Sequence, residues 1–263
     1  MRLVVGPDRV ELATDRLWAE GATAVEEQAQ AGGGVALVAG FPTESAAADV
    51  ARSAGGELVR VDETTWRDVW RVHAQPVRVA AMVVAPAWRA VDLGGAKAVI
   101  SIDPGGCFGS GSHPTTRLML AELQRRMRPG ASVFDVGTGS GVLSVAAARL
   151  GAGRVVAVDV DPEAVEVTRA NAAGNGVADR VAVSTQRAAE VAGTFDVVVA
   201  NLTAGVLAGL ASTLVGAVAP AGVLLVSGLL PGQWRHLAQG FAAMTVVDIV
   251  TLEGWVGVVL GTR

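Results

Sequence analysis

Three glycines and two acids stand close together in the segment FDVGTGSGVLSVAAARLGAGRVVAVDVDPEA, at residues 134–164. Asp135 precedes the glycines by two positions, and Asp159 ends the next apolar run. The glycines occupy alternate positions: Gly137, Gly139 and Gly141. A glycine turn between a strand and a helix permits positive φ and presents the N-terminal amides of the helix to a ligand. The segment therefore indicates a site for a nucleotide or a nucleoside-bearing cofactor.

Two cofactors compete for such a turn. Dinucleotides prefer the spacing G-x-G-x-x-G, whereas here the spacing is G-x-G-x-G and Val142 stands where the third glycine would fall. The carboxylate of Asp135 would repel a pyrophosphate, but it would attract the sulfonium and ammonium groups of S-adenosylmethionine. Asp159 could accept hydrogen bonds from the ribose hydroxyls of either ligand. The sequence thus favours S-adenosylmethionine, and it favours methyl transfer over hydride transfer.

A candidate catalytic residue follows a later apolar run, FDVVVANLTAG. Asn201 should emerge at the carboxyl end of that strand, on the same rim of the sheet as the glycine turn. In methyltransferases that act on amino groups, an Asn or Asp at this place accepts N–H bonds from the incoming amine. Orientation of the amine lone pair toward the methyl group is the main catalytic requirement. The alternative is that Asn201 only caps the helix expected over 204–218.

The loop IDPGGCFGSGSHPTTR, at residues 102–117, is a second region with chemical side chains. Thr115 and Thr116 could bind a ligand or satisfy the first turn of the helix that Pro114 enters. His113 could accept a proton, although a capping or packing role is the more ordinary one. The single cysteine, Cys107, is expected to be a small buried apolar residue rather than a nucleophile.

The elements that position these residues alternate in type from Ser132 onward. Apolar runs at 132–136, 154–160, 180–184, 195–201 and 222–228 predict strands, and helices are expected over 141–150, 162–173, 204–218 and 231–243. The last two runs, 245–253 and 255–261, are separated only by Gly254, so they must form an antiparallel hairpin. The prediction is an α/β protein with a doubly wound sheet of seven strands.

Residues 1–62 read as a separate small unit with the order β-α-β-β-α-β, an α+β ferredoxin-like arrangement. Residues 63–76 are expected to form a connector helix, in which Trp66 and Trp70, four positions apart, share one face. The larger domain then covers 77–263, and its first two apolar runs, VRVAAMVVAP and KAVISID, are interpreted as a hairpin.

Composition narrows the function classes. The net charge of −4 argues against a protein that grips nucleic acid through its phosphates. Residues 1–62 contain ten acids and five arginines, so this acidic front could meet a basic partner. One cysteine excludes an internal disulfide framework, and the three scattered histidines predict no metal site. The uncharged stretch at 197–234 is interrupted by polar residues and Pro220, so no membrane span is expected. We expect a cytoplasmic monomer.

Taken together, the motifs resemble a known family. IDPGGCFGSGSHPTT, DVGTGSGVLSVAAARLGA, VAVDVDPEAVEVTRANAAGNGV, VVVANLTAGVL and VSGLL look like those of the bacterial methyltransferases that modify large-subunit ribosomal protein eleven. The resemblance runs from about Trp66 to the C-terminus. It implies a class I methyltransferase fold, a ferredoxin-like substrate-recognition domain, and repeated methylation of α-amino and lysine ε-amino groups. It also implies that four residues contact S-adenosylmethionine: Thr116, Gly137, Asp159 and Asn201.

The chain departs from the family pattern at several positions. Ser110 and Ser112 stand where Thr is usual, Cys107 replaces Ala, and Thr203 replaces Leu or Tyr. An aromatic residue usual near Ala74 is absent. Three alternatives stay open at this point: a lysine methyltransferase with another protein substrate, a non-catalytic module that assists ribosome assembly, and a nicotinamide oxidoreductase.

Overall fold

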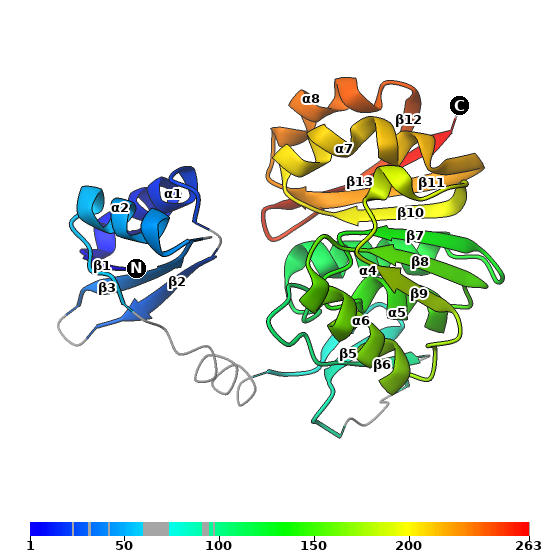
Figure 1. Cartoon of the computed structure of the whole chain (residues 1–263), viewed down its shortest axis with the longest axis horizontal. Helices are drawn as coiled ribbons and strands as arrows, with labels where there is room; N and C mark the ends of the chain where they lie inside the picture. Colours follow the sequence, from blue (N-terminus) through cyan, green and yellow to red (C-terminus); the bar gives the residue numbers. More distant parts are fainter. Residues whose placement is uncertain are drawn as a thin grey trace. The chain divides into compact units, whose positions relative to one another are not determined.

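The protein is described by a computed structural model that covers residues 1–22, 24–30, 33–41, 43–59, 74–90, 95–96 and 98–262. The chain divides into two compact units, Met1–Val69 and Trp70–Arg263, which Figure 1 colours blue and cyan to red. Each unit has its own cluster of buried apolar side chains. Each can therefore be treated as a separate folding unit.

The N-terminal unit is a three-stranded antiparallel sheet with two helices on one face (Figure 1). The strands are β1 (Arg2–Val5), β2 (Ala24–Ala29) and β3 (Val35–Gly40), in the order β1-β3-β2. A short turn, η1 (Pro7–Arg9), leads into α1 (Val10–Ala19), and α2 (Glu44–Ala54) follows β3. Thr43 caps α2 by accepting the N–H of Ala46, and Gly55 ends it at φ 73°, as the sequence pattern indicates.

The last strand expected for this unit is only partly described. Glu57 pairs with Arg2 in an isolated antiparallel bridge. Residues 60–73 lie outside the described residues, and with them lie Trp66, Trp70 and most of the connector expected over 63–76. The ferredoxin-like arrangement of residues 1–62 and the connector therefore stay predictions.

The larger unit is built on the seven-stranded sheet that the sequence predicts. Its order is β12-β13-β11-β10-β7-β8-β9, and every pairing is parallel except those of β13. The strands are β7 (Ser132–Val136), β8 (Arg154–Val158), β9 (Val181–Ser184), β10 (Phe195–Asn201), β11 (Val218–Leu229), β12 (Met244–Leu252) and β13 (Trp255–Thr262). The chain order reverses between β7 and β10, which is where ligands bind in sheets of this kind.

Helices cover both faces of this sheet (Figure 1). One apolar cluster joins the sheet to α4 (Pro114–Arg126) and α5 (Val142–Arg149), and α6 (Pro162–Gly174) packs beside them. The other cluster joins it to α7 (Ala204–Gly216) and the short α8 (Gln233–Leu237), with turns η2 (Ala188–Glu190) and η3 (Ala238–Phe241) nearby. The helix expected over 231–243 is thus divided into α8 and η3. Burial on both faces explains why the central strands are continuous apolar runs.

The hairpin expected from the first two strands of the larger unit was wrong. The antiparallel pair forms inside the first run, between β4 (Val77–Val79) and β5 (Met82–Pro86), with Ala80 at φ 50° in the turn. The second run, β6 (Ala98–Ile102), pairs with β5 in parallel. The segment from 87 to 97 is long enough to return the chain to the same end of the sheet, so a parallel pairing is possible.

The C-terminal hairpin is confirmed: β12 and β13 are antiparallel, and Glu253 and Gly254 form the turn. Within the described part of the chain, no helix is long and apolar enough to cross a membrane. The uncharged stretch at 197–234 contains most of β10, together with α7 and β11. The two strands are largely buried in the larger unit, and α7 packs one apolar face against the sheet.

Candidate active site

The glycine turn lies between β7 and α5, at the carboxyl edge of the sheet. Gly137, Gly139 and Gly141 have φ of 73°, 54° and 78°. A Cβ atom on Gly139 would lie 2.7 Å from the carbonyl oxygen of Phe108, which belongs to a different loop. Glycine is therefore required here by the backbone conformation and by the close approach of protein backbone. The sequence alone predicts that a ligand approaches these glycines closely, whereas the group that approaches Gly139 is protein backbone.

Asp135 lies beneath this turn, at the end of β7, and is only 1% exposed. Its Oδ2 accepts hydrogen bonds from the hydroxyls of Ser144 at 2.6 Å and Thr138 at 2.8 Å. Burial raises the pKa of this carboxyl to about 6, against the lowering effect of those hydrogen bonds, and nearby Asp159 adds to the rise. The acid therefore holds the turn to the first part of α5, a contact that the sequence alone does not predict. At neutral pH it adds negative charge below the turn.

Asp159 follows β8 on the same edge and is half-buried. Its Oδ2 accepts the N–H of Gly139 at 2.9 Å, and its Oδ1 accepts the N–H of Asp161 at 3.1 Å. Each carboxylate oxygen has a further lone pair. The side chain is therefore held by backbone on two sides and keeps the capacity to bind a pair of hydroxyls.

Asn201, the last residue of β10, also reaches this edge. Its Nδ2 donates to Oγ1 of Thr115 at 3.1 Å. The next helix, α7, has Thr203 at its N-cap position, and no side chain there makes a capping hydrogen bond. Asn201 is therefore engaged across the rim with α4 and does not cap α7, which removes the alternative considered from the sequence.

Thr115 and its neighbours form the wall of the site contributed by α4. His113 is the N-cap: its Nδ1 accepts the N–H of Thr115 at 3.3 Å and lies 2.8 Å from Thr115 Oγ1. Thr116 is 1% exposed, and its Oγ1 has no hydrogen-bond partner among the described residues. A buried hydroxyl without a partner is costly, so it fits a position that a ligand's polar group completes.

Two aromatic residues border the same wall. The ring of Phe108 meets the His113 ring edge-on with centroids 5.2 Å apart, and the Trp255 ring does so at 4.9 Å. Phe108 is 56% exposed, which is unusual for so large an apolar side chain. Sequence reasoning missed Phe108 and Trp255, since Trp255 lies in the C-terminal hairpin with no motif around it. A search for aromatic residues beside a glycine loop could have found Phe108.

The loop that carries Phe108 and the strand β6 before it are held by two asparagines, Asn171 in α6 and Asn175 at its C-cap. Asn171 accepts the N–H of Asp103 at 2.9 Å and donates to the carbonyls of Asp103 and Ser140, both at 2.8 Å. Asn175 makes the same paired contact with Ser101, at 2.8 Å and 2.7 Å. Asn171 thereby joins the loop to the glycine turn. Neither asparagine was singled out from the sequence.

Two further points from the sequence concern Cys107 and possible metal ligands. Cys107 is half-buried in the loop. Across the described residues, no group of three His, Cys, Asp or Glu side chains gathers in a way that could hold a metal ion.

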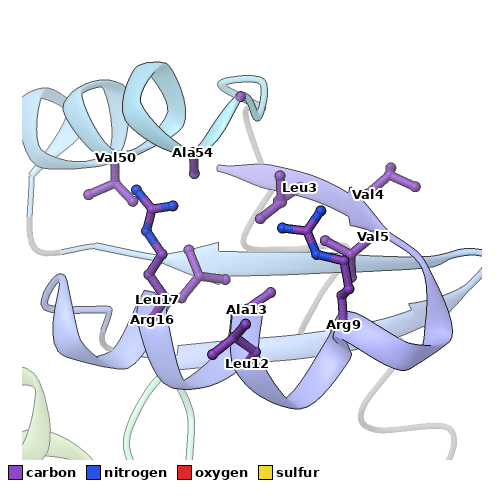
Figure 2. Close-up of a pocket in the computed structure, with 11 residues that line it drawn as sticks. Leu3, Val4, Val5, Arg9, Leu12, Ala13, Arg16, Leu17, Val50 and Ala54 are labelled. Carbon is purple, nitrogen blue, oxygen red and sulfur yellow. The ribbon is translucent and has the colours of Figure 1, made fainter.

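The N-terminal unit contains a different kind of hollow, of about 260 Å³, between β1 and the two helices (Figure 2). Its main lining side chains are apolar, with one arginine from η1 and one from α1: Leu3, Leu12, Leu17, Val50, Arg9 and Arg16. It is lined by no carboxylate, histidine or cysteine among the described residues. The candidate site therefore stays at the edge of the large sheet, where the polar side chains described above gather.

Comparison with known proteins gives one consistent result. The model of the family described as Ribosomal protein L11 methyltransferase (PrmA) matches residues 19–262. A relative with that description from Pelotomaculum thermopropionicum is 51% identical over 172 residues, which are 65% of this chain and 56% of that protein. Another, from Geobacter sp. (strain M21), is 45% identical over 190 residues, 70% of this chain and 62% of that protein. The matches thus span less than two thirds of the length of these curated relatives.

A solved structure agrees with them. A crystal structure described as a ribosomal protein L11 methylase from Lactobacillus delbrueckii subsp. bulgaricus superimposes with a TM-score of 0.67 at 30% identity. The superposition covers 72% of this chain and 99% of that chain.

Proposed function

Because the chain belongs to the ribosomal protein L11 methyltransferase family, we propose that it transfers methyl groups from S-adenosylmethionine to amino groups of ribosomal protein L11. The observation that carries the proposal is that Asp159 bonds the glycine turn after β7, while Asn201 ends the neighbouring strand β10, at the point where the strand order reverses. That meeting combines a place for a nucleoside with a polar group suited to an amine.

The residues of the rim fit the proposed donor. Asp159 has the acceptor capacity for two ribose hydroxyls, and Thr116 Oγ1 is a buried hydroxyl that lacks a partner among the described residues. Asp135 contributes negative charge beneath the turn, which favours a cation and disfavours a pyrophosphate. S-adenosylmethionine, when bound, supplies a methyl group on a positively charged sulfur. The same features count against a nicotinamide dinucleotide.

The chain's own work in the reaction is to orient the amine. The amine must arrive neutral, having lost its extra proton to water, and its nitrogen forms the new bond to the methyl carbon while the carbon–sulfur bond breaks. The Oδ1 of Asn201 accepts an N–H of the amine and aims the nitrogen lone pair at the methyl group. Phe108 and Trp255 offer apolar surface for the methylene groups of a lysine. Both α-amino and lysine ε-amino groups meet these requirements.

The wider setting belongs to the same proposal. The N-terminal unit recognises the ribosomal protein, and the acidic balance of residues 1–62 suits a basic partner. Direct contact with nucleic acid is not needed for the reaction. The protein works in the cytoplasm as a monomer.

The experiment is an intact-mass measurement. Purified protein is incubated with S-adenosylmethionine and ribosomal protein L11 from the same organism, and the L11 mass is followed with time. We expect stepwise gains of one methylene unit, and we expect Asn201→Ala to abolish them while S-adenosylmethionine still binds. Mass gains on another protein but not on L11 would refute the proposal that L11 is the substrate. A wild-type protein that methylates nothing, yet supports ribosome assembly as well as its Asn201→Ala variant does, would refute the enzyme.

A further inference from the structure

The hydrogen bonds that lead away from Asn201 form a short chain whose polarity can be worked out. Asn201 Nδ2 lies 3.1 Å from Thr115 Oγ1, and Thr115 Oγ1 lies 2.8 Å from His113 Nδ1. The backbone N–H of Thr115 also points at His113 Nδ1, at 3.3 Å. A backbone N–H can only donate, so His113 Nδ1 must be the acceptor and carry a lone pair.

This single fact determines the rest of the chain. Because Nδ1 is an acceptor, the contact with Thr115 Oγ1 requires the hydroxyl to donate its one proton to the imidazole. The hydroxyl oxygen then has only lone pairs left for Asn201, so the group of Asn201 that faces it must be the NH₂. The amide oxygen consequently faces the other way.

We infer that His113 is a positioning residue that acts through Thr115 to keep the Asn201 amide in one of its two orientations, with Oδ1 as the acceptor for the substrate amine. The inference rests on the proposed function, in which Asn201 accepts an N–H of the amine. With the amide reversed, its NH₂ would confront the N–H groups of the amine, and donor would face donor.

The state of the imidazole agrees with this role. Burial lowers the pKa of His113, and the nearby carboxylate of Glu253 only partly opposes the effect. The ring is therefore neutral at neutral pH, with its proton on Nε2. Two aromatic rings, those of Phe108 and Trp255, hold it edge-on.

The helix cap and the positioning contact can be separated by substitution. Thr115→Val removes the hydroxyl but keeps the backbone N–H that His113 caps, whereas Thr115→Ser keeps both. His113→Ser keeps a side chain that caps a helix but has no imidazole to take the hydroxyl proton. In that variant the Thr115 hydroxyl is released and can donate to the amide oxygen, which allows the amide to reverse.

The first test compares the two Thr115 variants in L11 methylation. We expect kcat of Thr115→Val to be at least roughly tenfold below that of Thr115→Ser, as is usual when a polar group next to the reaction loses its orientation. The Kd for S-adenosylmethionine, measured by calorimetry, should be the same in both, which also shows that both are folded. Equal kcat values in the two variants would overturn the inference.

The second test uses Asn201→Asp, because a carboxylate presents oxygen on both sides and cannot be reversed. Beside His113, the Thr115 hydroxyl has no proton left for the new carboxylate, so the substitution should lower kcat. In the His113→Ser background the hydroxyl can donate to the carboxylate, so the same substitution should raise kcat by several-fold relative to His113→Ser alone. An equal loss in both backgrounds would overturn the inference.

A third measurement does not depend on activity, so it separates this inference from the proposed function. The chain has three histidines, and ¹⁵N labelling of histidine with His113→Ser as the assignment variant reports the ring state of His113 in the full-length protein. We expect a neutral ring with the proton on Nε2 at neutral pH. A ring protonated on Nδ1 overturns the inference even if L11 is methylated. The expected ring state with no methylation of L11 leaves the hydrogen-bond chain in place and refutes the proposed function instead.

Discussion

Asp135 is a carboxylic acid with almost no access to water, and its energetic effect depends on pH. Its pKa rises from an ordinary 3.8 to about 6 on folding, mainly through burial. Below pH 3.8 the acid is protonated in the folded and unfolded chains alike, and the burial has no ionisation cost. Between pH 3.8 and 6 only the folded chain holds the proton. Above pH 6 the folded state carries a buried charge that costs about 3 kcal/mol.

This leads to a prediction for Asp135→Asn, which cannot ionise. As the pH rises from about 3 to about 7, the free energy of unfolding of the wild type should fall relative to that of the variant by about 3 kcal/mol, and the difference should then level off. Urea unfolding of the cofactor-free protein at a series of pH values measures it. Two curves that stay parallel over this range would mean that the carboxyl titrates normally.

Gly139 is the second residue for which the structure predicts a large effect of substitution on stability. We predict that Gly139→Ala lowers the free energy of unfolding by about 2–4 kcal/mol, because φ is +54° and the new Cβ would meet the carbonyl oxygen of Phe108. Gly209→Ala is the matched control. That glycine lies exposed inside α7 with open space around it, so alanine there should stabilise the protein by about 0.5–1 kcal/mol. Thermal unfolding of both variants checks the pair, and a destabilised control would contradict the reasoning.

At the scale of elements, α6 is important because it fastens a distant loop to the glycine turn. Asn171 is buried and bonds the backbone of both Asp103 and Ser140, whereas Asn175, one helical turn later, reaches only Ser101 and its own helix. The two asparagines make similar numbers of contacts. Only the first touches the turn.

The pair therefore separates stability from ligand binding. We predict that Asn171→Ala and Asn175→Ala each lower the free energy of unfolding by about 2–3 kcal/mol, since each leaves backbone groups without partners. Asn171→Ala should also weaken S-adenosylmethionine binding roughly tenfold. Asn175→Ala should change that affinity little. Calorimetric titration measures both affinities, and equal values for the two variants would show that the glycine turn keeps its shape without the contact from Asn171.

Element prediction from the sequence succeeded where the local pattern was strong. The strands from β7 to β13, the helices α4 to α7 and the final hairpin follow from apolar runs, caps and a short turn at Gly254, which in the structure also includes Glu253. The parallel pairing of β5 and β6 was missed, because the direction of a pairing depends on the path of the connecting segment and not on the strands themselves. The helix after β11 was also shorter than its pattern indicated.

At the scale of the whole molecule, the two units have separate apolar cores. Met1–Val69 has one cluster of buried apolar side chains, and Trp70–Arg263 has two large clusters and one small cluster around its sheet. All of the residues assigned to the site belong to the larger unit. We proposed above that the smaller unit recognises the substrate. Cofactor binding and substrate recognition can therefore be tested separately.

We predict that a chain of residues 70–263 binds S-adenosylmethionine with the affinity of the full-length protein but loses methylation of intact L11. The reason is that the cofactor residues keep their own core, whereas the partner loses its docking unit. Calorimetry and intact-mass measurement give the two readouts. Adding the separate N-terminal unit at high concentration serves as a control. Undiminished methylation by the shortened chain would remove any recognition role from residues 1–69.

The sequence by itself determined most elements from α4 onward, the glycine turn with its two acids, and the place of Asn201 at a strand end, because each depends on neighbours only a few positions away. The tertiary structure decided which side chains meet: Asn201 and Thr115, 86 residues apart, or Asn171 and Asp103, 68 apart. It also decided that Asp135 is buried and that Phe108 covers Gly139. Local periodicity encodes strands and helices, but contacts between them, and the pKa values that follow, arise only when the elements pack.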